Sequence, residues 1–301
     1  MLILEFGRWI FLKTKAFVYI ILTGVLWGTS SIFFNVLTPL GFSPLQMTAM
    51  RGGVAAVVMS VYVFIRDRAL FKISLKELVL FALSGFAVFG TASSYFTAIE
   101  ASSVSAAVVL MYTAPVFVLG FSVAFLGEKL NFKKLMAVAA MLAGCVFVSG
   151  IMGNMNFSVK GFFIGLLSGV CYSAYNIITK IEMMNKSNST SASMYCFIFM
   201  GATAILFSNP VQMVSVAAKN PALSIPLMIG IGVFTCVLPY FLYTKALKDM
   251  PVGTATALGI IEPMAATVFS VVIFGERIGA LSLSGIILIL AAVFVLGKSE
   301  E

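Results

Sequence analysis

The acidic residue best placed to do chemistry is Glu262, which lies in the middle of a long apolar run and directly before Pro263. If that run spans a membrane, a carboxylate at its centre costs about 2.5–3.5 kcal/mol and should face the protein interior or a wet cavity. Pro263 cannot donate a backbone hydrogen bond, which predicts a broken helix and a free carbonyl near Gly259. Glu262 therefore indicates either a contact for a cation or polar solute, or a carboxyl group that holds helices together.

The basic residue Arg51 also lies well inside an apolar run. Its side chain could extend toward the membrane surface, bind the carboxylate of a solute, or pair with Glu262. The structural alternative is an anchor to backbone carbonyls or to groups at the interface.

Aromatic side chains with polar atoms are spread through the apolar runs of both halves of the chain. Rings that carry a hydroxyl or an indole N–H suit the lining of a cavity for an amphipathic solute, although core packing or an interfacial belt would use the same residues. The candidate binding residues of this kind are Trp27, Tyr95, Tyr112, Tyr172, Tyr175 and Tyr243, with Tyr240 as a further member.

Several enzyme classes lack the residues they need. The sequence has no histidine, which excludes His-based triads and His-ligated metals, and it has no phosphate-binding Gly-rich loop for ATP. The four cysteines lie inside apolar runs without metal-ligand spacing and are expected to pack as small apolar residues. We therefore expect no enzyme activity, no cofactor and no metal.

The composition is that of an integral membrane protein. Apolar residues make up 61% of the chain, charged residues 10%, and the mean hydropathy is +1.09. A soluble domain carries roughly 25% charged residues. The apolar runs predict an all-α membrane protein with ten transmembrane helices near residues 16–36, 45–65, 77–97, 104–125, 133–151, 161–180, 192–208, 223–244, 252–274 and 279–297.

Lysine and arginine are distributed unevenly over the connections between these spans. Placing the N-terminus in the cytoplasm puts 15 of the 19 basic residues on the cytoplasmic side and leaves Lys160, Lys219 and Arg277 outside. The positive-inside rule then predicts a plasma-membrane protein with both termini in the cytoplasm. The net charge of +8 needs no nucleic-acid partner, and residues 1–15, with Trp9, are expected to form an interfacial helix.

An internal repeat relates the two halves of the chain. Residues 95–129 and 243–277 match at 11 of 35 positions without gaps, and both segments end in Gly-Glu followed by a basic residue. Five spans per half place the turn at Glu128 on the cytoplasmic face and the turn at Glu276 on the outer face. The chain is therefore expected to be a 5+5 inverted-topology repeat, with halves at 16–151 and 161–297, typical of transporters.

The fourth and ninth spans share a proline, Pro115 in one and Pro263 in the other. Small residues that permit close packing precede both prolines: Ser102, Ser103, Ser105, Ala106 and Ala107, then Gly253, Thr254, Ala255, Thr256, Ala257 and Gly259. We expect Pro115, Pro263 and Gly259 to act as hinges, with simple packing as the alternative.

The sequence resembles the EamA family of the drug/metabolite transporter superfamily. The residues that carry the resemblance are Gly24-Val-Leu-Trp27-Gly28, Arg51, Tyr95-x-x-Ala98, Pro115, Gly127-Glu128, Tyr172 to Tyr175, Tyr243-x-x-Ala246, Glu262-Pro263 and Gly275-Glu276. The resemblance implies ten helices in an inverted repeat, a central cavity between the halves, peripheral fifth and tenth helices, and export or exchange of small metabolites such as amino acids. With Arg51 as the single intramembrane basic residue, a phosphorylated substrate is not expected.

These observations predict a secondary transporter that moves a small organic metabolite, such as an amino acid or a similar amphipathic solute, outward by alternating access. The alternative is a non-transporting membrane scaffold or sensor partner. A channel would need a ring of equivalent polar residues, which the repeat does not provide. Proton coupling through Glu262, facilitated diffusion and exchange remain open, and the sequence gives no indication of oligomeric state.

Overall fold

The computed structural model describes residues 2–101, 104–149, 158–275 and 279–299, which form helices and turns without a strand. The first half contains α1 (Leu2–Gly28), α2 (Ser30–Leu37), α3 (Pro44–Arg66), η1 (Arg68–Phe71), α4 (Leu75–Ala101), α5 (Val104–Met111), α6 (Ala114–Phe125) and α7 (Phe132–Ser149). The second half contains α8 (Val159–Met184), α9 (Ser189–Phe207), α10 (Pro210–Lys219), α11 (Pro221–Gly232), the π-helix η3 (Val233–Val237), α12 (Leu238–Ala246), α13 (Val252–Leu258), α14 (Ile261–Phe274) and α15 (Ala280–Ser299).

Within these ranges, nine apolar helical segments are long enough to cross a membrane, and a shorter apolar helix at Ala280–Leu296 follows them. Each of the ten predicted spans is matched by one of these segments, so the all-α membrane fold is confirmed. Four spans are made of more than one helix: α1 with α2, α5 with α6, α11 with η3 and α12, and α13 with α14.

The structure differs from the sequence prediction at the start of the first span and in the connection after α9. Helix α1 runs from Leu2 to Gly28 without interruption, so residues 2–15 continue directly into the first span, and the interfacial location of residues 1–15 stays a prediction. The connection after α9 forms the short helix α10, which begins at Pro210 and is capped by the Asn209 side chain. Val216 of α10 is buried against the end of the first span, which explains why this connection is helical.

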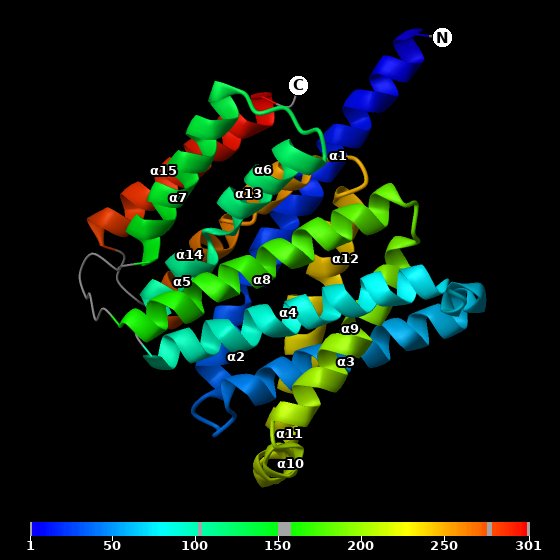
Figure 1. Ribbon diagram of the computed structural model, residues 1–301. Coiled ribbons are helices and arrows are strands. Elements are labelled where there is room, and N and C mark those ends of the chain that lie inside the picture. Colours follow the sequence, from blue (N-terminus) through cyan, green and yellow to red (C-terminus); the bar gives the residue numbers. More distant parts are fainter. Residues whose placement is uncertain (1, 102–103, 150–157, 276–278, 300–301) are drawn as a thin grey trace.

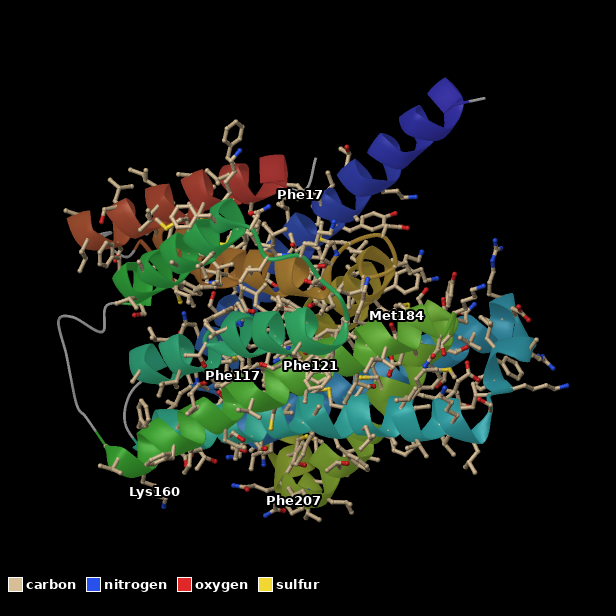
Figure 2. All side chains as sticks on the ribbon, turned by 45° about the horizontal axis from the view of Figure 1, so that its top comes forward. Phe17, Phe117, Phe121, Lys160, Met184 and Phe207 are labelled. Carbon is tan, nitrogen blue, oxygen red and sulfur yellow. The ribbon has the colours of Figure 1, made fainter. Side chains whose placement is uncertain are left out.

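The outer surface of the bundle is apolar. Large apolar side chains such as Ile65, Phe125 and Leu206 are more than 70% exposed. Figure 2 shows Phe207 at the edge of the bundle, pointing away from its helix. A surface of this kind suits contact with lipid chains rather than water.

The helix contacts occur in pairs related by the repeat. In one half of the pattern, α8 is packed against α4 and against the broken span of α5 and α6. In the other half, α1 is packed in the same way against α12 and against the broken span of α13 and α14. Helix α3 crosses α9, and α7 crosses α15, as counterparts from the two halves. Figure 1 shows α4 and α8 side by side across the bundle, with the pair α7 and α15 at its edge.

The repeated Gly-Glu turn has the same backbone conformation in both halves where it is described. Gly127 after α6 and Gly275 after α14 both have φ of +69°, a left-handed conformation that glycine adopts without strain. The Glu128 carboxylate at the end of the fourth span accepts a hydrogen bond from the N–H of Val252 at the start of the ninth, at 2.7 Å. The two spans are therefore antiparallel and the two turns lie at opposite ends of the bundle, as an inverted repeat requires.

Glycines set the closest approach of α1 to α14. A Cβ added at Gly28 would lie 2.7 Å from the Cβ of Ala265 and 3.0 Å from the carbonyl oxygen of Glu262. At Gly24, four residues earlier, the added atom would lie 2.9 Å from the Cβ of Ile261. This spacing of small residues lets the backbones of two membrane helices touch, and here it fixes the position of Glu262.

We predict that Gly28→Ala lowers the stability of the protein by about 1–3 kcal/mol, because the new methyl group overpacks the contact with α14. Thermal unfolding of the purified protein in detergent measures this change. Gly120→Ala in α6 is the matched control, since its added Cβ meets nothing within 4 Å. A Gly28→Ala protein that unfolds at or above the wild-type temperature would contradict the contact.

Candidate functional site

The fourth and ninth spans are each interrupted near the middle. Residues Tyr112 and Thr113 separate α5 from α6, and Gly259 and Ile260 separate α13 from α14. At both breaks a 3₁₀-type hydrogen bond tightens the turn: Val116 N–H donates to the Thr113 carbonyl at 2.9 Å, and Glu262 N–H donates to the Gly259 carbonyl at 2.9 Å. The predicted break at Pro263 is present. The prediction of a free carbonyl at Gly259 is wrong, because this tighter turn uses it.

A side-chain hydrogen bond joins the two breaks. The Tyr112 hydroxyl donates to Oε2 of Glu262 at 2.7 Å, and Tyr112 itself is buried. Tyr95 of α4 and Cys145 of α7 also lie close enough to Glu262 to interact with it electrostatically. The predicted residues Glu262, Tyr112 and Tyr95 are therefore gathered around one point between the two halves.

Arg51 lies on α3 and does not meet Glu262 within 4.0 Å in the described structure. Its Nη2 donates to the backbone carbonyl of Thr235 at 3.2 Å. Thr235 lies in the π-helix η3, four residues before Pro239. Because proline has no N–H, Pro239 cannot donate the usual helical hydrogen bond to the Thr235 carbonyl. The guanidinium thus satisfies an acceptor that the proline exposes, which corresponds to the backbone-anchor alternative.

The hydrogen bond from Nη2 to the Thr235 carbonyl leaves another N–H of the Arg51 guanidinium without an acceptor in the described structure. Arginine carries five N–H donors, and the buried Nε of Arg51 has no hydrogen-bond partner among the described residues. Arg51 also lies close to Cys236 and Tyr240 on the eighth span. Its proposed part in solute binding is untested and stays a prediction.

The remaining predicted aromatic residues form one buried cluster. The Trp27 ring of α1 lies 6.2 Å from Tyr172, 5.3 Å from Tyr240 and 5.6 Å from Tyr243, measured between ring centroids. Tyr175 completes the cluster at 5.4 Å from Tyr240. The Trp27 Nε1 and Tyr172 Oη atoms are buried without hydrogen-bond partners in the described part of the protein, so polar atoms remain available within an aromatic surface.

The end of the bundle nearest α13 holds two charged side chains against the eighth and ninth spans. Glu128 accepts from the first N–H groups of α13, and Lys134 Nζ lies 3.4 Å from its other oxygen. Lys180 Nζ donates to the carbonyls of Leu247 and Met250, each at 2.8 Å, and so caps the end of α12. Anions stabilise a helix N-terminus and cations a C-terminus, so both contacts fix the helices that carry Glu262 and the aromatic cluster.

The sequence pattern did not identify every buried polar residue. Glu182 lies just beyond the predicted sixth span, 161–180, yet only 1% of it is exposed, and Asn176 and Thr179 on the same helix are also buried. Their spacing from Tyr172, at intervals of three and four residues, was the signal that could have placed them on one face. Ser102, Ser103 and the side chain of Ser105, predicted as packing residues, fall outside the described part.

A metal site has no basis in the described ranges, where no group of three His, Cys, Asp or Glu residues could hold an ion.

Comparisons with known proteins agree on one family. The EamA-like transporter family matches residues 14–150 and 159–298. An uncharacterized transporter of Archaeoglobus fulgidus is 28% identical over 280 residues, 92% of this chain and 94% of that protein. The uncharacterized transporter YwfM of Bacillus subtilis is 25% identical over 285 residues, 94% of each chain. A solved crystal structure with 17% sequence identity has a TM-score of 0.78 over 96% of this chain and 99% of that one, and so shares its fold.

We predict that Glu128→Ala destabilises the protein by about 1–2 kcal/mol, because it leaves the first N–H groups of α13 without their acceptor. Thermal unfolding in detergent measures the loss. Glu100→Ala serves as the control, since Glu100 is exposed at the end of α4. Equal unfolding temperatures for the two variants would show that the cap contributes nothing.

Proposed function

Because this chain belongs to the EamA-like transporter family, we propose that it is a secondary transporter for a small amphipathic metabolite such as an amino acid. It moves the solute outward across the plasma membrane by alternating access, with both termini in the cytoplasm. The family matches cover both halves of the chain, and the relatives bear transporter names. The substrate class and the direction of transport are our proposal.

The observation that carries the proposal is the hydrogen bond between Tyr112 and Glu262 at the meeting point of two antiparallel broken helices. Broken helices offer polar groups at membrane depth without exposing an unpaired backbone to lipid. A solute with an ammonium group can replace the tyrosine hydroxyl as the donor to Glu262. Binding would then loosen the contact that holds the two breaks together.

The surroundings of Glu262 match the three parts of an amino acid. The carboxylate suits the ammonium group, and the unpartnered Nε of Arg51 suits the solute carboxylate. The rings of Trp27, Tyr172, Tyr175 and Tyr243 suit an apolar side chain. A solute with separated positive and negative groups and an apolar body is therefore favoured over a phosphate or a sugar.

Movement between the two access states is assigned to the breaks. Pro115 and Pro263 each lie just after an interruption, and Gly259 lies within one, so the two halves of each span can tilt about these points. The tight contacts of Gly24 and Gly28 tie α14 to α1, so α1 moves with α14 as one lever. The distribution of lysine and arginine supports placing the Glu128 turn on the cytoplasmic side.

We predict that Glu262→Gln weakens solute binding about 10- to 150-fold, since a hydrogen bond to a charged group contributes about 1.5–3 kcal/mol. The measurement is counterflow of radiolabelled L-leucine, L-phenylalanine and L-threonine into proteoliposomes that contain the purified protein. Arg51→Lys keeps the charge but loses the planar fork, and we expect it to weaken the same step.

Glu100→Gln is the matched control, because it removes an exposed carboxylate on α4 and should leave counterflow unchanged. Wild-type affinity and rate in Glu262→Gln would remove this residue from the mechanism. Absence of counterflow by the wild-type protein for all three amino acids would contradict the proposed substrate class, and a scaffold or sensor role would then gain support.

A further inference from the structure

One face of α8 carries a line of buried polar side chains. Tyr172, Asn176, Thr179 and Glu182 follow at intervals of four, three and three residues, which places them on the same side of the helix. All four are buried, with Asn176 at 0% and Glu182 at 1% exposure. Figure 2 labels Lys160 and Met184 near the two ends of this helix, and the line occupies its last four turns.

Each of these side chains has a polar atom that makes no hydrogen bond within 3.5 Å in the described protein. These atoms are Tyr172 Oη, Asn176 Nδ2 and Oδ1, Thr179 Oγ1 and Glu182 Oε1. The Tyr172 hydroxyl and the Asn176 amide face each other at a longer distance. A buried polar atom without a partner costs more free energy than an ordinary hydrogen bond contributes, so native proteins contain few of them. Five such atoms along one helix face therefore require partners, and water is the usual one inside proteins.

The line reaches the site at mid-membrane through Tyr172. The Tyr172 hydroxyl lies 3.1 Å from the point where a Cβ would stand on Gly259, at the break of the ninth span. Glu262 follows three residues later, at the start of α14. Glycine at position 259 thus leaves room for Tyr172 to approach the helix break that presents Glu262.

The other end of the line is Glu182. No lysine or arginine of the described ranges lies within 4.0 Å of its carboxyl group, and Lys180 on the same helix is engaged with the carbonyls of Leu247 and Met250. Helix α4 presents the hydroxyl of Ser84 to Glu182, but that hydroxyl donates to the Phe81 carbonyl at 2.9 Å. The titratable groups that face this region are Cys196 on α9, Tyr175 on α8, and Tyr240 and Tyr243 on α12, which pack against Tyr175.

The first half of the chain has no equivalent line. Aligning Gly24-Val25 with Gly169-Val170 places Trp27, Ser31, Phe34 and Leu37 at the four matching positions of the first span. An apolar leucine stands where α8 has Glu182, and a phenylalanine where it has Thr179. The polar line therefore leads from Glu262 toward one end of the bundle only, the end where Glu128 and Lys180 lie.

We propose that this face of α8 is a hydrated proton path that joins Glu262 at mid-membrane to Glu182 at the end of the bundle where Glu128 and Lys180 lie, with protons passing along it in either direction. The inference rests on the proposed transport function and adds proton as the coupling ion. A hydronium ion from solution protonates the Glu182 carboxylate and leaves a water molecule. The proton then passes along waters held by Thr179, Asn176 and Tyr172 to the Glu262 carboxylate, and Glu182 returns to its ionised form. No bond other than those to the proton forms or breaks.

The transport test separates proton-driven movement from exchange of solute. The full chain is reconstituted into proteoliposomes, and movement of L-leucine, L-phenylalanine and L-threonine is measured in two assays. The first assay measures counterflow at equal pH on both sides. The second measures movement of the amino acid against its own concentration gradient under an imposed pH difference. We expect Glu182→Gln to reduce the pH-driven movement about 100-fold, the scale on which a lost proton-transfer group acts, and to leave counterflow unchanged.

Thr179→Val removes one hydroxyl at nearly constant volume and should reduce pH-driven movement by a smaller factor, which keeps the test valid if Glu182→Gln does not fold. Glu100→Gln should behave as the wild type in both assays. Wild-type pH-driven movement in both Glu182→Gln and Thr179→Val would overturn the path.

A second measurement needs no solute. Hydroxyl radicals generated from bound water by a short X-ray pulse oxidise the side chains next to that water, and mass spectrometry locates the products. We expect Cys196, beside Glu182, and Tyr172 to be modified although both are buried. Met194, fully buried on a different side of α9 from Cys196, should stay unmodified. Equal protection of all three would overturn the hydrated path.

The two measurements also distinguish the inference from the function on which it rests. Counterflow without any response to the pH difference would leave the transporter in place and remove the proton path. Modified Cys196 and Tyr172 in a protein that transports none of the three amino acids would keep the path and contradict the proposed solute.

Discussion

A carboxyl group in the middle of an apolar bundle needs a hydrogen-bond donor from the protein, and Glu262 finds this donor in Tyr112. The donor comes from the other half of the chain, so this side-chain contact joins the two repeats where their broken spans are interrupted. Both partners stand at helix breaks, where proline has removed backbone hydrogen bonds. Much of the remaining architecture can be understood as the support that this contact requires.

The supports come from both ends of the broken spans. Gly24 and Gly28 bring α1 against α14 and fix the depth of Glu262, while Gly165 and Gly169 bring α8 against the break after α5 in the same way. Glu128 and Lys180 hold the turn between the eighth and ninth spans at one end of the bundle. The helices follow the repeat, but the side chains at the breaks do not. The repeat aligns Glu262 with Ala114 and Tyr112 with Ile260, so each polar residue has an apolar counterpart. Each half supplies one member of the contact, and a solute between them would meet an asymmetric site.

The sequence predicted the ten spans, the inverted repeat and the helix break at Pro263, because hydropathy, proline and the Gly-Glu turn act locally. It also placed Glu262 and Tyr112 among the candidate residues. It did not predict that they bond, because the two residues are 150 positions apart and their contact depends on how antiparallel helices pack. Arg51 illustrates the same limit, since its acceptor is a carbonyl freed by Pro239 on a span from the other half. Glu182 was not among the candidate residues because it lies beyond the predicted sixth span, whereas the packing of α8 against its neighbours buries it.

The central claim, that Tyr112 and Glu262 bond to each other and tie the two halves together, is tested most directly by a double-mutant cycle. The free energy of unfolding in detergent is measured for the wild type, Tyr112→Phe, Glu262→Leu and the double variant. The structure predicts a favourable coupling energy of about 0.6 kcal/mol, the average measured for hydrogen bonds between membrane helices, and of at most about 1.7 kcal/mol. Additive effects of the two substitutions would mean that the residues do not interact, and would contradict the account.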